Sequence, residues 1–502
     1  MRVLLIQTPQ VTRDVISLKG IEMPMNLAYL ASGLEHPGDL LSAYGHDVLP
    51  ESLELREKEP INVRILDLQF YQDPWRILSS EVRRFKPSLI GITSFTIQAK
   101  HVDRIAQVAK ERDDDVLITF GGPHASALPG KSLSEMPHVD VIVVGEGEVT
   151  LLEIAGCVFS KNEGNSTNEV RHHLSKVKGI YYRDAGDKKE IKVSPPRPLI
   201  KNLDLIPFPA RDKLHLEMYK PLFVNYWRLP STGILSSRGC PYNCSYCSKA
   251  VFKRKFRMRS PENVLEEMRS CEKKYGIKDF RFYDDAVTIS RHWVKKFCKL
   301  LIDQDTDYTW NAFSRVSDVT PAMLKMMKRA GCYHLKFGVE TGSNHILKQI
   351  NKTTTLQDAR NAIKHTDEAG MESLAYFIIN FPGESIDSML NTIKFAKELN
   401  ATYAMFFHCK PLPGSKLYAD AVRDDTLIHT DWEYYGEEDP PVLRNQASYR
   451  ETRNILRDAY NQYYLRPRYL MKWVKDIALN FSIEKIKRLF DGIKTFMPSR
   501  RQ

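Results

Sequence analysis

The stretch GILSSRGCPYNCSYCSK, residues 233–249, places three cysteines within eight positions directly after a short apolar run. The three thiols, Cys240, Cys244 and Cys247, lie in a segment whose glycine and proline favour an irregular loop. The other five of the chain's eight cysteines are scattered, and such isolated thiols are usually small buried side chains. We expect a cytoplasmic protein, and the reducing cytoplasm disfavours disulfides. The clustered thiols are therefore predicted to ligate a metal centre.

Three thiolates in one loop are compatible with two kinds of metal centre. Structural zinc takes four ligands, usually as two Cys or His pairs, and no second Cys-x-x-Cys occurs in this chain. A 4Fe-4S cube held by three cysteines keeps one iron open for a substrate or cofactor. The spacing therefore favours an iron-sulfur cluster, with zinc as the alternative.

The cysteine loop begins a series of alternating predicted strands and helices. Apolar runs typical of buried parallel strands occur at 233–238, 278–285, 308–315, 334–342, 373–383 and 401–412. Amphipathic stretches such as 260–276 and 320–331 separate them. Six such repeats predict a parallel barrel, complete or partial, with its site at the carboxyl ends of the strands.

The arrangement Cys-x-x-x-Cys-x-aromatic-Cys after the first barrel strand resembles the radical S-adenosylmethionine superfamily. The resemblance implies that the open iron of a 4Fe-4S cluster binds the amino and carboxylate groups of S-adenosylmethionine. One electron then cleaves the sulfonium to give methionine and a 5′-deoxyadenosyl radical. In such enzymes the cofactor carries the difficult chemistry, and the protein positions and shields it.

The same resemblance suggests residues that contact S-adenosylmethionine at the second strand. FYDD supplies Tyr283, Asp284 and Asp285 where the family's backbone meets the methionine amino group. Two adjacent carboxylates at a strand end could instead cap the next helix. Both interpretations of this segment stay open.

Later strands supply three further candidates by resemblance. FSRV places Arg315 where a guanidinium could hold the methionine carboxylate, although an exposed salt-bridging arginine is the alternative. GVETG places Glu340 where family members bind the ribose hydroxyls, and a carboxylate offers two acceptor oxygens for that purpose. FIINFPGE resembles the adenine-side segment, but Asn380 stands where glycine is common.

The first 150 residues also alternate strands with helices. Continuous Val- and Ile-rich runs at 3–9, 63–68, 89–95, 116–122 and 139–148 are separated by helical patterns at 26–34, 75–85 and 98–113. This order predicts a doubly wound α/β domain, in which ligands bind beyond the carboxyl ends of the strands. Neither G-x-G-x-x-G after the first strand nor a G-x-x-x-x-G-K-[ST] loop is present, which disfavours the usual dinucleotide and triphosphate sites.

Three short segments at these strand ends resemble the cobalamin-binding domain fused to one large subgroup of the same superfamily: TSF (93–95), GGPHASALP (121–129) and VGEGEVTL (144–151). Glycines there allow close approach of backbone to a large flat ligand, although they could be plain turn residues. The candidates for cobalamin contact are Thr93, Ser94, Gly121, Gly122, His124, Gly145, Glu146, Gly147 and Glu148. No histidine follows an aspartate in the family's D-x-H-x-x-G pattern, so His124 is interpreted as corrin-contacting or structural and not as a cobalt ligand.

The domain organisation predicted from these patterns has four parts. Residues 1–160 form a Rossmann-like cobalamin-binding domain, 161–230 a linker with a small hairpin, 231–430 the radical core barrel, and 431–502 a basic helical region. From Arg466 the chain holds ten Lys or Arg against three Asp or Glu, and its net charge is +11. A basic amphipathic helix can lie on anionic lipid, although a solvated helix face is the alternative.

These features together predict a cytoplasmic cobalamin-dependent radical S-adenosylmethionine enzyme that is peripherally membrane-associated through its tail. The expected reaction is methylation of an unactivated carbon in a lipid-like or other secondary metabolite, with flavodoxin or ferredoxin as electron donor. Radical cyclisation or rearrangement of a tetrapyrrole or lipid is the enzymatic alternative. A non-catalytic iron-sulfur and cobalamin sensor on nucleic acid is the alternative from another class, and no single catalytic residue is predicted.

Overall fold

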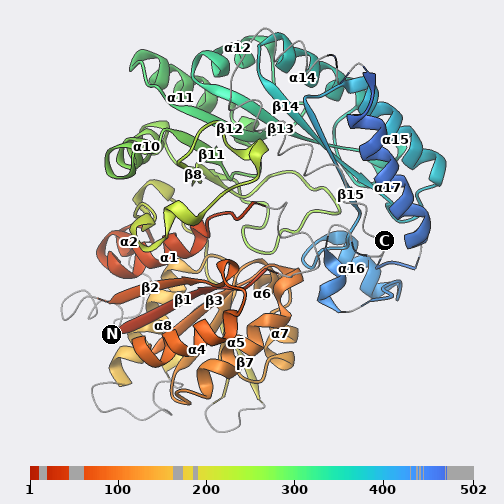
Figure 1. Ribbon diagram of the computed structural model, residues 1–502. Helices are drawn as coiled ribbons and strands as arrows, with labels where there is room; N and C mark the ends of the chain where they lie inside the picture. The colour runs from red at the N-terminus through yellow and green to blue at the C-terminus, as the bar shows by residue number, and fades with distance from the viewer. Residues whose placement is uncertain are drawn as a thin grey trace.

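The computed structural model describes residues 1–10, 20–44, 61–161, 173–184, 190–429, 431–436, 439, 442–444, 446–467, 469 and 471. Two large sheets organise the chain, one in each half, and a two-stranded ribbon accompanies the second. Figure 1 shows the N-terminal lobe in red and orange below the C-terminal lobe in green and blue. The segment after β8 runs between the two lobes.

The first sheet has seven strands in the order β2-β1-β3-β4-β5-β6-β7. Its strands are β1 (Arg2–Gln7), β2 (Asn62–Asp67), β3 (Leu89–Thr93), β4 (Leu117–Gly121), β5 (Val141–Val143), β6 (Ile180–Arg183) and β7 (Ile191–Val193). The first five are parallel, and every residue of β3 is buried, as expected for a strand covered on both faces. The predicted hairpin forms β6 and β7, which extend this sheet antiparallel from β5.

Helices cover both faces of the first sheet. One face carries α1 (Met25–Glu35), α2 (Pro37–Tyr44) and α8 (Glu148–Lys161), and the other carries α4 (Pro74–Phe85), α5 (Lys100–Lys110), α6 (Pro123–Ala127) and α7 (Pro129–Glu135). Two separate apolar cores result, one under each helical layer. This doubly wound arrangement leaves the ends of β3, β4 and β5 facing the second lobe.

The second sheet has six parallel strands in the order β15-β14-β13-β12-β11-β8. They are β8 (Ser231–Ile234), β11 (Asp279–Phe282), β12 (Thr309–Ser314), β13 (Cys332–Glu340), β14 (Glu372–Ile379) and β15 (Tyr403–His408). The ribbon pairs β9 (Ser237–Arg238) with β10 (Arg257–Met258). The sheet curves as a partial barrel, which confirms the predicted order of a doubly wound domain followed by an incomplete parallel barrel (Figure 1).

Helices pack on the outer face of the partial barrel. They are α10 (Pro261–Tyr275), α11 (Arg291–Asp303), α12 (Pro321–Arg329), α13 (Asn344–Gln349), α14 (Leu356–Glu368), α15 (Ile386–Leu399) and α17 (Tyr449–Tyr464), while α16 (Lys416–Arg423) packs against the first lobe. Hydroxyl N-caps begin most of them, for example Ser260 at α10 and Thr320 at α12. One continuous core joins α10, α11, α12, α14, α15 and α17 to alternate residues of the strands, while α13 packs in a smaller cluster with Phe381 and Cys409.

The basic tail predicted from Arg466 lies mostly outside the described residues. Within the described chain it contributes the short segment after α17. A search of the described helices finds none with the length and apolar character needed to span a bilayer.

Candidate functional site

The cysteine loop follows β8 at the carboxyl edge of the second sheet. Gly239 precedes the first thiol with φ +83°, and a Cβ there would lie 2.4 Å from the carbonyl oxygen of Lys255. The chain therefore needs glycine at this turn, both for its left-handed conformation and for the close approach of the segment before β10. All three cysteines are half-buried and unbridged.

Backbone hydrogen bonds anchor the loop to the far side of the barrel. Ser245 N–H donates to the carbonyl of Ile350 (2.9 Å), and Leu417 N–H donates to the carbonyl of Ser245 (2.8 Å). Lys249 N–H donates to the carbonyl of Gly414 (3.2 Å). Segments that follow β13 and β15 thus fix the loop across the open end of the sheet.

The environment of the thiols fits an iron-sulfur centre. Burial raises the pKa of Cys240 and Cys247, Asp285 and Cys244 add to that rise, and the Lys249 ammonium, 3.6 Å from Cys247 Sγ, opposes it. Within the part of the chain that the structure describes, no three His, Cys, Asp or Glu side chains are close enough to share one metal ion. Three thiols held in one loop beside a cation are the donor set of a cluster, in which each thiolate binds a different iron.

The predicted FYDD residues have three different surroundings. Asp284 is buried and accepts hydrogen bonds from Ser236 N–H (3.2 Å), Ser236 Oγ (2.8 Å) and Ser237 Oγ, and burial raises its pKa to about 6. It therefore holds the segment before the cysteines and does not cap the next helix. Asp285 is exposed near the thiols, and the hydroxyl of Tyr283 donates to Glu22 (2.7 Å).

Arg315 and Glu340 lie at neighbouring strand ends, on the same edge as the cysteine loop. Arg315 is buried, donates to Thr353 Oγ1 (2.7 Å), and places its guanidinium 3.8 Å from the ring centre of Tyr242 in the cysteine loop. It is thus not the exposed salt-bridging arginine that was the alternative. Glu340 has φ +73° and pairs with the buried Lys352, a partner that sequence reasoning missed.

Asn380 uses its side chain within the protein. Its Oδ1 accepts from Ala447 N–H (2.9 Å), and its Nδ2 donates to the carbonyl of Ala447 (3.2 Å). Its φ of +63° explains why an asparagine can stand where glycine is common. These contacts tie the end of β14 to the segment before α17.

A cavity of about 560 Å³ lies between the two sheets. Eight of the nine predicted cobalamin-contact residues line it, together with Arg238, Val251 and Phe252 from the cysteine-loop side. Gly122 has φ +98°, and a Cβ there would lie 2.8 Å from Thr93 Oγ1. The buried Ser94 Oγ has no protein partner among the described residues. Close backbone and an unsatisfied hydroxyl at an apolar cavity fit a large flat cofactor such as a corrin.

His124 is the predicted residue that does not line this cavity. Its ring lies 4.9 Å from that of Trp432, and its Nδ1 lies 3.3 Å from Thr96 Oγ1. Burial, and then the Lys131 charge, lower its pKa to about 4, so it is neutral near pH 7. The structure therefore favours the structural interpretation of His124 over corrin contact.

Four charged side chains join the two lobes beside the cavity, and we call Glu146, Glu148, Arg238 and Arg257 the interlobe clasp. Arg238 pairs with Glu146 (2.7 Å) and with Glu148 (2.5 Å), and Arg257 pairs with Glu146 (2.9 Å). The two glutamates line the cavity, but their carboxylates are committed to these arginines. The clasp thus fixes the VGEGE segment against the strand that leads into Cys240.

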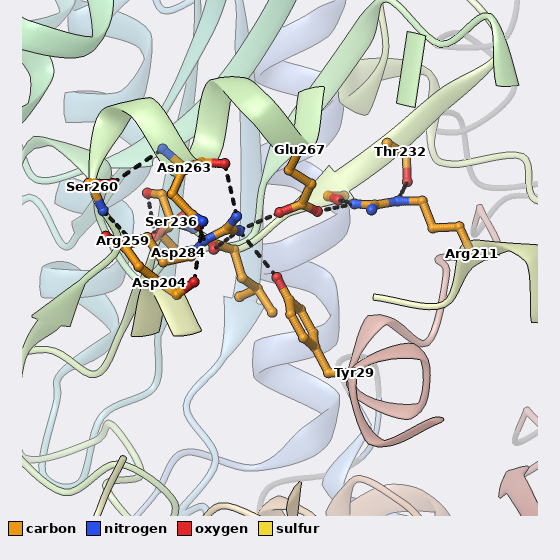
Figure 2. A network of polar contacts seen from close by, with 12 residues as sticks. Tyr29, Asp204, Arg211, Thr232, Ser236, Arg259, Ser260, Asn263, Glu267 and Asp284 are labelled. Atoms are coloured by element: carbon orange, nitrogen blue, oxygen red, sulfur yellow. Dashed lines mark hydrogen bonds and ion pairs between the residues drawn. The ribbon is translucent and has the colours of Figure 1, made fainter. Parts of the chain in front are cut away.

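A second buried network supports the same strand, and Figure 2 shows it around α10. Glu267 lies between two guanidinium groups and pairs with Arg211 (2.6 Å) and with Arg259. Arg259 also donates to the Leu235 carbonyl (3.1 Å), next to β8, and approaches the hydroxyl of Tyr29 on α1 (3.4 Å). Sequence reasoning missed this network, because Arg211 and Glu267 are 56 positions apart and Glu267 alone looks like part of the polar face of an ordinary helix.

Comparison with known protein families matches both halves of the chain. The Radical SAM superfamily model matches residues 234–396, and the B12 binding domain model matches residues 13–155. These ranges contain the cysteine loop and the lobe that supplies most of the cavity lining.

Individual relatives agree with these matches. The chain is 31% identical over 475 residues to "Uncharacterized methyltransferase PH0819" of Pyrococcus horikoshii, covering 94% of each chain. It is 28% identical over 422 residues to an anaerobic magnesium-protoporphyrin IX monomethyl ester cyclase of Rubrivivax gelatinosus, covering 84% of this chain and 72% of that protein. The solved structure of the cobalamin-dependent S-adenosylmethionine radical enzyme OxsB has the same fold, with a TM-score of 0.69 at 16% identity over 99% of this chain and 71% of OxsB.

Proposed function

Because the chain belongs to the B12-binding radical S-adenosylmethionine enzymes, we propose that it transfers a methyl group to an unactivated carbon of a small molecule. Its cofactors are a 4Fe-4S cluster, S-adenosylmethionine and cobalamin. A relative that carries a methyltransferase name covers nearly the whole chain, which supports methyl transfer in particular. Because these relatives carry the names of enzymes, we do not propose the non-catalytic sensor.

One structural observation carries the proposal: the cysteine-loop side of the second lobe forms part of the cavity wall. Val251 and Phe252 line the cavity and lie only a few residues after Cys247, and Arg238 lines it just before Cys240. A corrin in this cavity and a cluster on this loop would therefore share one wall. Such proximity suits a reaction that needs a radical and a transferable methyl group at one substrate.

The chemistry that these groups supply when bound is reductive cleavage of S-adenosylmethionine at the cluster and a methyl group on the corrin. The chain's own residues would orient the partners. We propose that Cys240, Cys244 and Cys247 hold the cluster, that Glu340 accepts hydrogen bonds from the ribose hydroxyls, and that Arg315 faces the methionine carboxylate. Lys352 orients the Glu340 carboxylate, since it pairs with that carboxylate in a buried site.

The segments around these residues have supporting roles in the proposal. Asp284 fixes the strand before the cysteines, and Asn380 fixes the end of β14. The glycines of the first lobe let backbone approach the corrin, while Thr93 and Ser94 offer hydroxyls to its polar edge. We also propose the predicted domain boundaries, in which residues 1–160 bind cobalamin and residues 231–430 bind the cluster and S-adenosylmethionine.

Radical cyclisation or rearrangement without methyl transfer is the second candidate. The observation that favours it is the 28% identity to a protein named as a cyclase. Both candidates use the same cluster and cavity, so they differ in the fate of the substrate radical. We propose a flavodoxin or ferredoxin as electron donor in either case.

Comparing metabolites of a wild-type strain and a deletion strain after anoxic growth separates the candidates. Methyl transfer predicts that the wild type contains a compound in which a methyl group replaces one hydrogen, and that label from methyl-labelled methionine enters it. Cyclisation predicts a product that gains no label. An unlabelled product that depends on this gene would overturn the methyltransferase proposal and support the second candidate.

A further inference from the structure

The inner face of the partial barrel differs from its outer face. On β14 and β15, Phe377 and Phe406 point outward and are buried in the core with the helices. The alternate residues Tyr376 and Phe407, and Phe313 on β12, keep partly exposed side chains. Large apolar groups that stay partly exposed on a concave face indicate a surface that a ligand can cover.

Three of these inner side chains form a continuous surface, and we call Phe313, Tyr376 and Phe407 the aromatic wall. The rings of Phe313 and Tyr376 are 5.8 Å apart at 23°, and those of Tyr376 and Phe407 are 5.9 Å apart at 25°. Tyr376 is in register with Gly338 on β13, which has no side chain to separate the rings. Near-parallel rings from three strands form one continuous apolar surface.

The aromatic wall lies next to the proposed S-adenosylmethionine site. A Cβ on Gly338 would lie 2.4 Å from Glu340 Oε1 and 3.0 Å from Lys352 Nζ. The glycine over which the rings meet therefore contacts the carboxylate proposed to bind the ribose. A molecule on the wall would lie within reach of a radical formed there.

A carboxylate from the first lobe lies at the other end of this surface. Glu22 accepts hydrogen bonds from Asn225 Nδ2 (2.8 Å) and Tyr283 (2.7 Å) and pairs with Arg281. Its side chain is 34% exposed, and it lines the cavity between the sheets. Arg281, which pairs with Glu22, is in register with Asn311, two residues before Phe313 on the adjacent strand β12. Glu22 and the wall therefore lie over the same face of the sheet.

The neighbouring ammonium of Lys336 is committed to the protein. It is fully buried, donates to Asn225 (2.8 Å) and Asn311 (2.7 Å), and lies 5.2 Å from the centre of the Phe313 ring. It joins the base of the wall to the residue that holds Glu22. Lys336 is thus not offered to a ligand, whereas the partly exposed Glu22 carboxylate is, and a carboxylate only accepts hydrogen bonds.

We propose that the aromatic wall and Glu22 form the substrate site, and that the substrate is a flat, largely apolar molecule with an N–H or O–H donor at one edge. The inference rests on the proposed function, whose substrate it specifies. The flat body would stack on the wall, and the donor would bind Glu22. Arg281 already balances the carboxylate, so a neutral donor suits the site better than an anionic edge, which the carboxylate would repel.

Equilibrium dialysis of the reconstituted full-length protein with two probes tests this site. The probes are 2-naphthol and 2-methoxynaphthalene, which share a flat body but differ in the O–H donor. Wild type should bind 2-naphthol at least about tenfold more tightly, since the hydrogen bond goes to a charged acceptor. Equal affinity for the two probes, or no binding of either, would overturn the proposal, and this comparison needs no variant.

Three variants locate the binding. Phe407→Leu should weaken both probes several-fold, whereas Phe406→Leu, on the same strand but facing the helices, should leave both affinities unchanged. Glu22→Gln should weaken 2-naphthol alone and reduce its preference. Equal effects of the two phenylalanine variants, or an unchanged preference in Glu22→Gln, would refute the site.

The two proposals can fail separately. Binding is measured without turnover, so probe binding in a protein that transfers no methyl group would leave this site standing and reject the proposed function. Conversely, a protein that methylates its metabolite but shows no donor preference would keep the function and reject this site.

Discussion

Removing one charge from the interlobe clasp should destabilise the protein far more than removing one charge from an exposed ion pair. The Glu146 side chain is 4% exposed and serves both Arg238 and Arg257, whose side chains are 8% and 13% exposed. Glu146→Gln keeps the size of the side chain but takes from Arg257 the carboxylate that it pairs with and leaves Arg238 with Glu148 alone. Breaking a buried pair in this way costs about 3–5 kcal/mol.

That free energy corresponds to a large shift in thermal unfolding. For a lobe of about 150–250 residues, a loss of this free energy lowers Tm by roughly 6–20 °C, which circular dichroism can measure. The matched control is Glu398→Gln, which breaks an exposed ion pair between Glu398 (side chain 53% exposed) and Arg360 (39% exposed). This change should cost less than about 1 kcal/mol. Equal Tm values for the two variants would refute the reasoning that the clasp is a desolvated, stabilising contact between the lobes.

Three further perturbations test individual residues. Cys244→Ala should abolish iron and sulfide incorporation after anaerobic reconstitution, whereas Cys298→Ala, at a buried position of α11, should retain both. Full iron content in Cys244→Ala would reject the cluster assignment. The buried His124 has a pKa lowered from 6.5 to about 4, so its contribution to stability is complete above pH 6.5 and is lost as the pH falls toward 4. Between pH 6.5 and 4, the free energy of unfolding should therefore depend less steeply on pH in His124→Phe than in the wild type. An unchanged slope would contradict the lowered pKa of His124. Glu340→Gln should weaken S-adenosylmethionine binding by about tenfold in equilibrium dialysis, since a hydrogen bond to a charged group is replaced by one to a neutral group; unchanged affinity would remove Glu340 from the site.

The positions of the strands along the chain could be predicted because their apolar patterns are local. Buried parallel strands such as β3 are continuous apolar runs, and the cysteine spacing indicated a cluster-binding loop directly after β8. Glycines also marked turns after strands, and the structure gives Gly122 and Gly239 the positive φ that such turns require. Each of these signals lies within a few residues of the chain.

Contacts between the lobes could not be predicted in the same way. Arg238 and Glu146 are 92 positions apart, and no sequence pattern gives the orientation of one sheet against the other. A carboxylate at a strand end suits a cofactor or an arginine equally well, so the glutamates of VGEGE were predicted to contact the corrin. The structure instead pairs them with arginines across the interface.

The most direct test of the whole account is the cleavage of S-adenosylmethionine by anaerobically reconstituted protein that holds both cluster and corrin. The account predicts 5′-deoxyadenosine from the wild type in the presence of a strong reductant, and none from Cys244→Ala. Absence of 5′-deoxyadenosine from wild-type protein with full iron content and corrin absorption would contradict it.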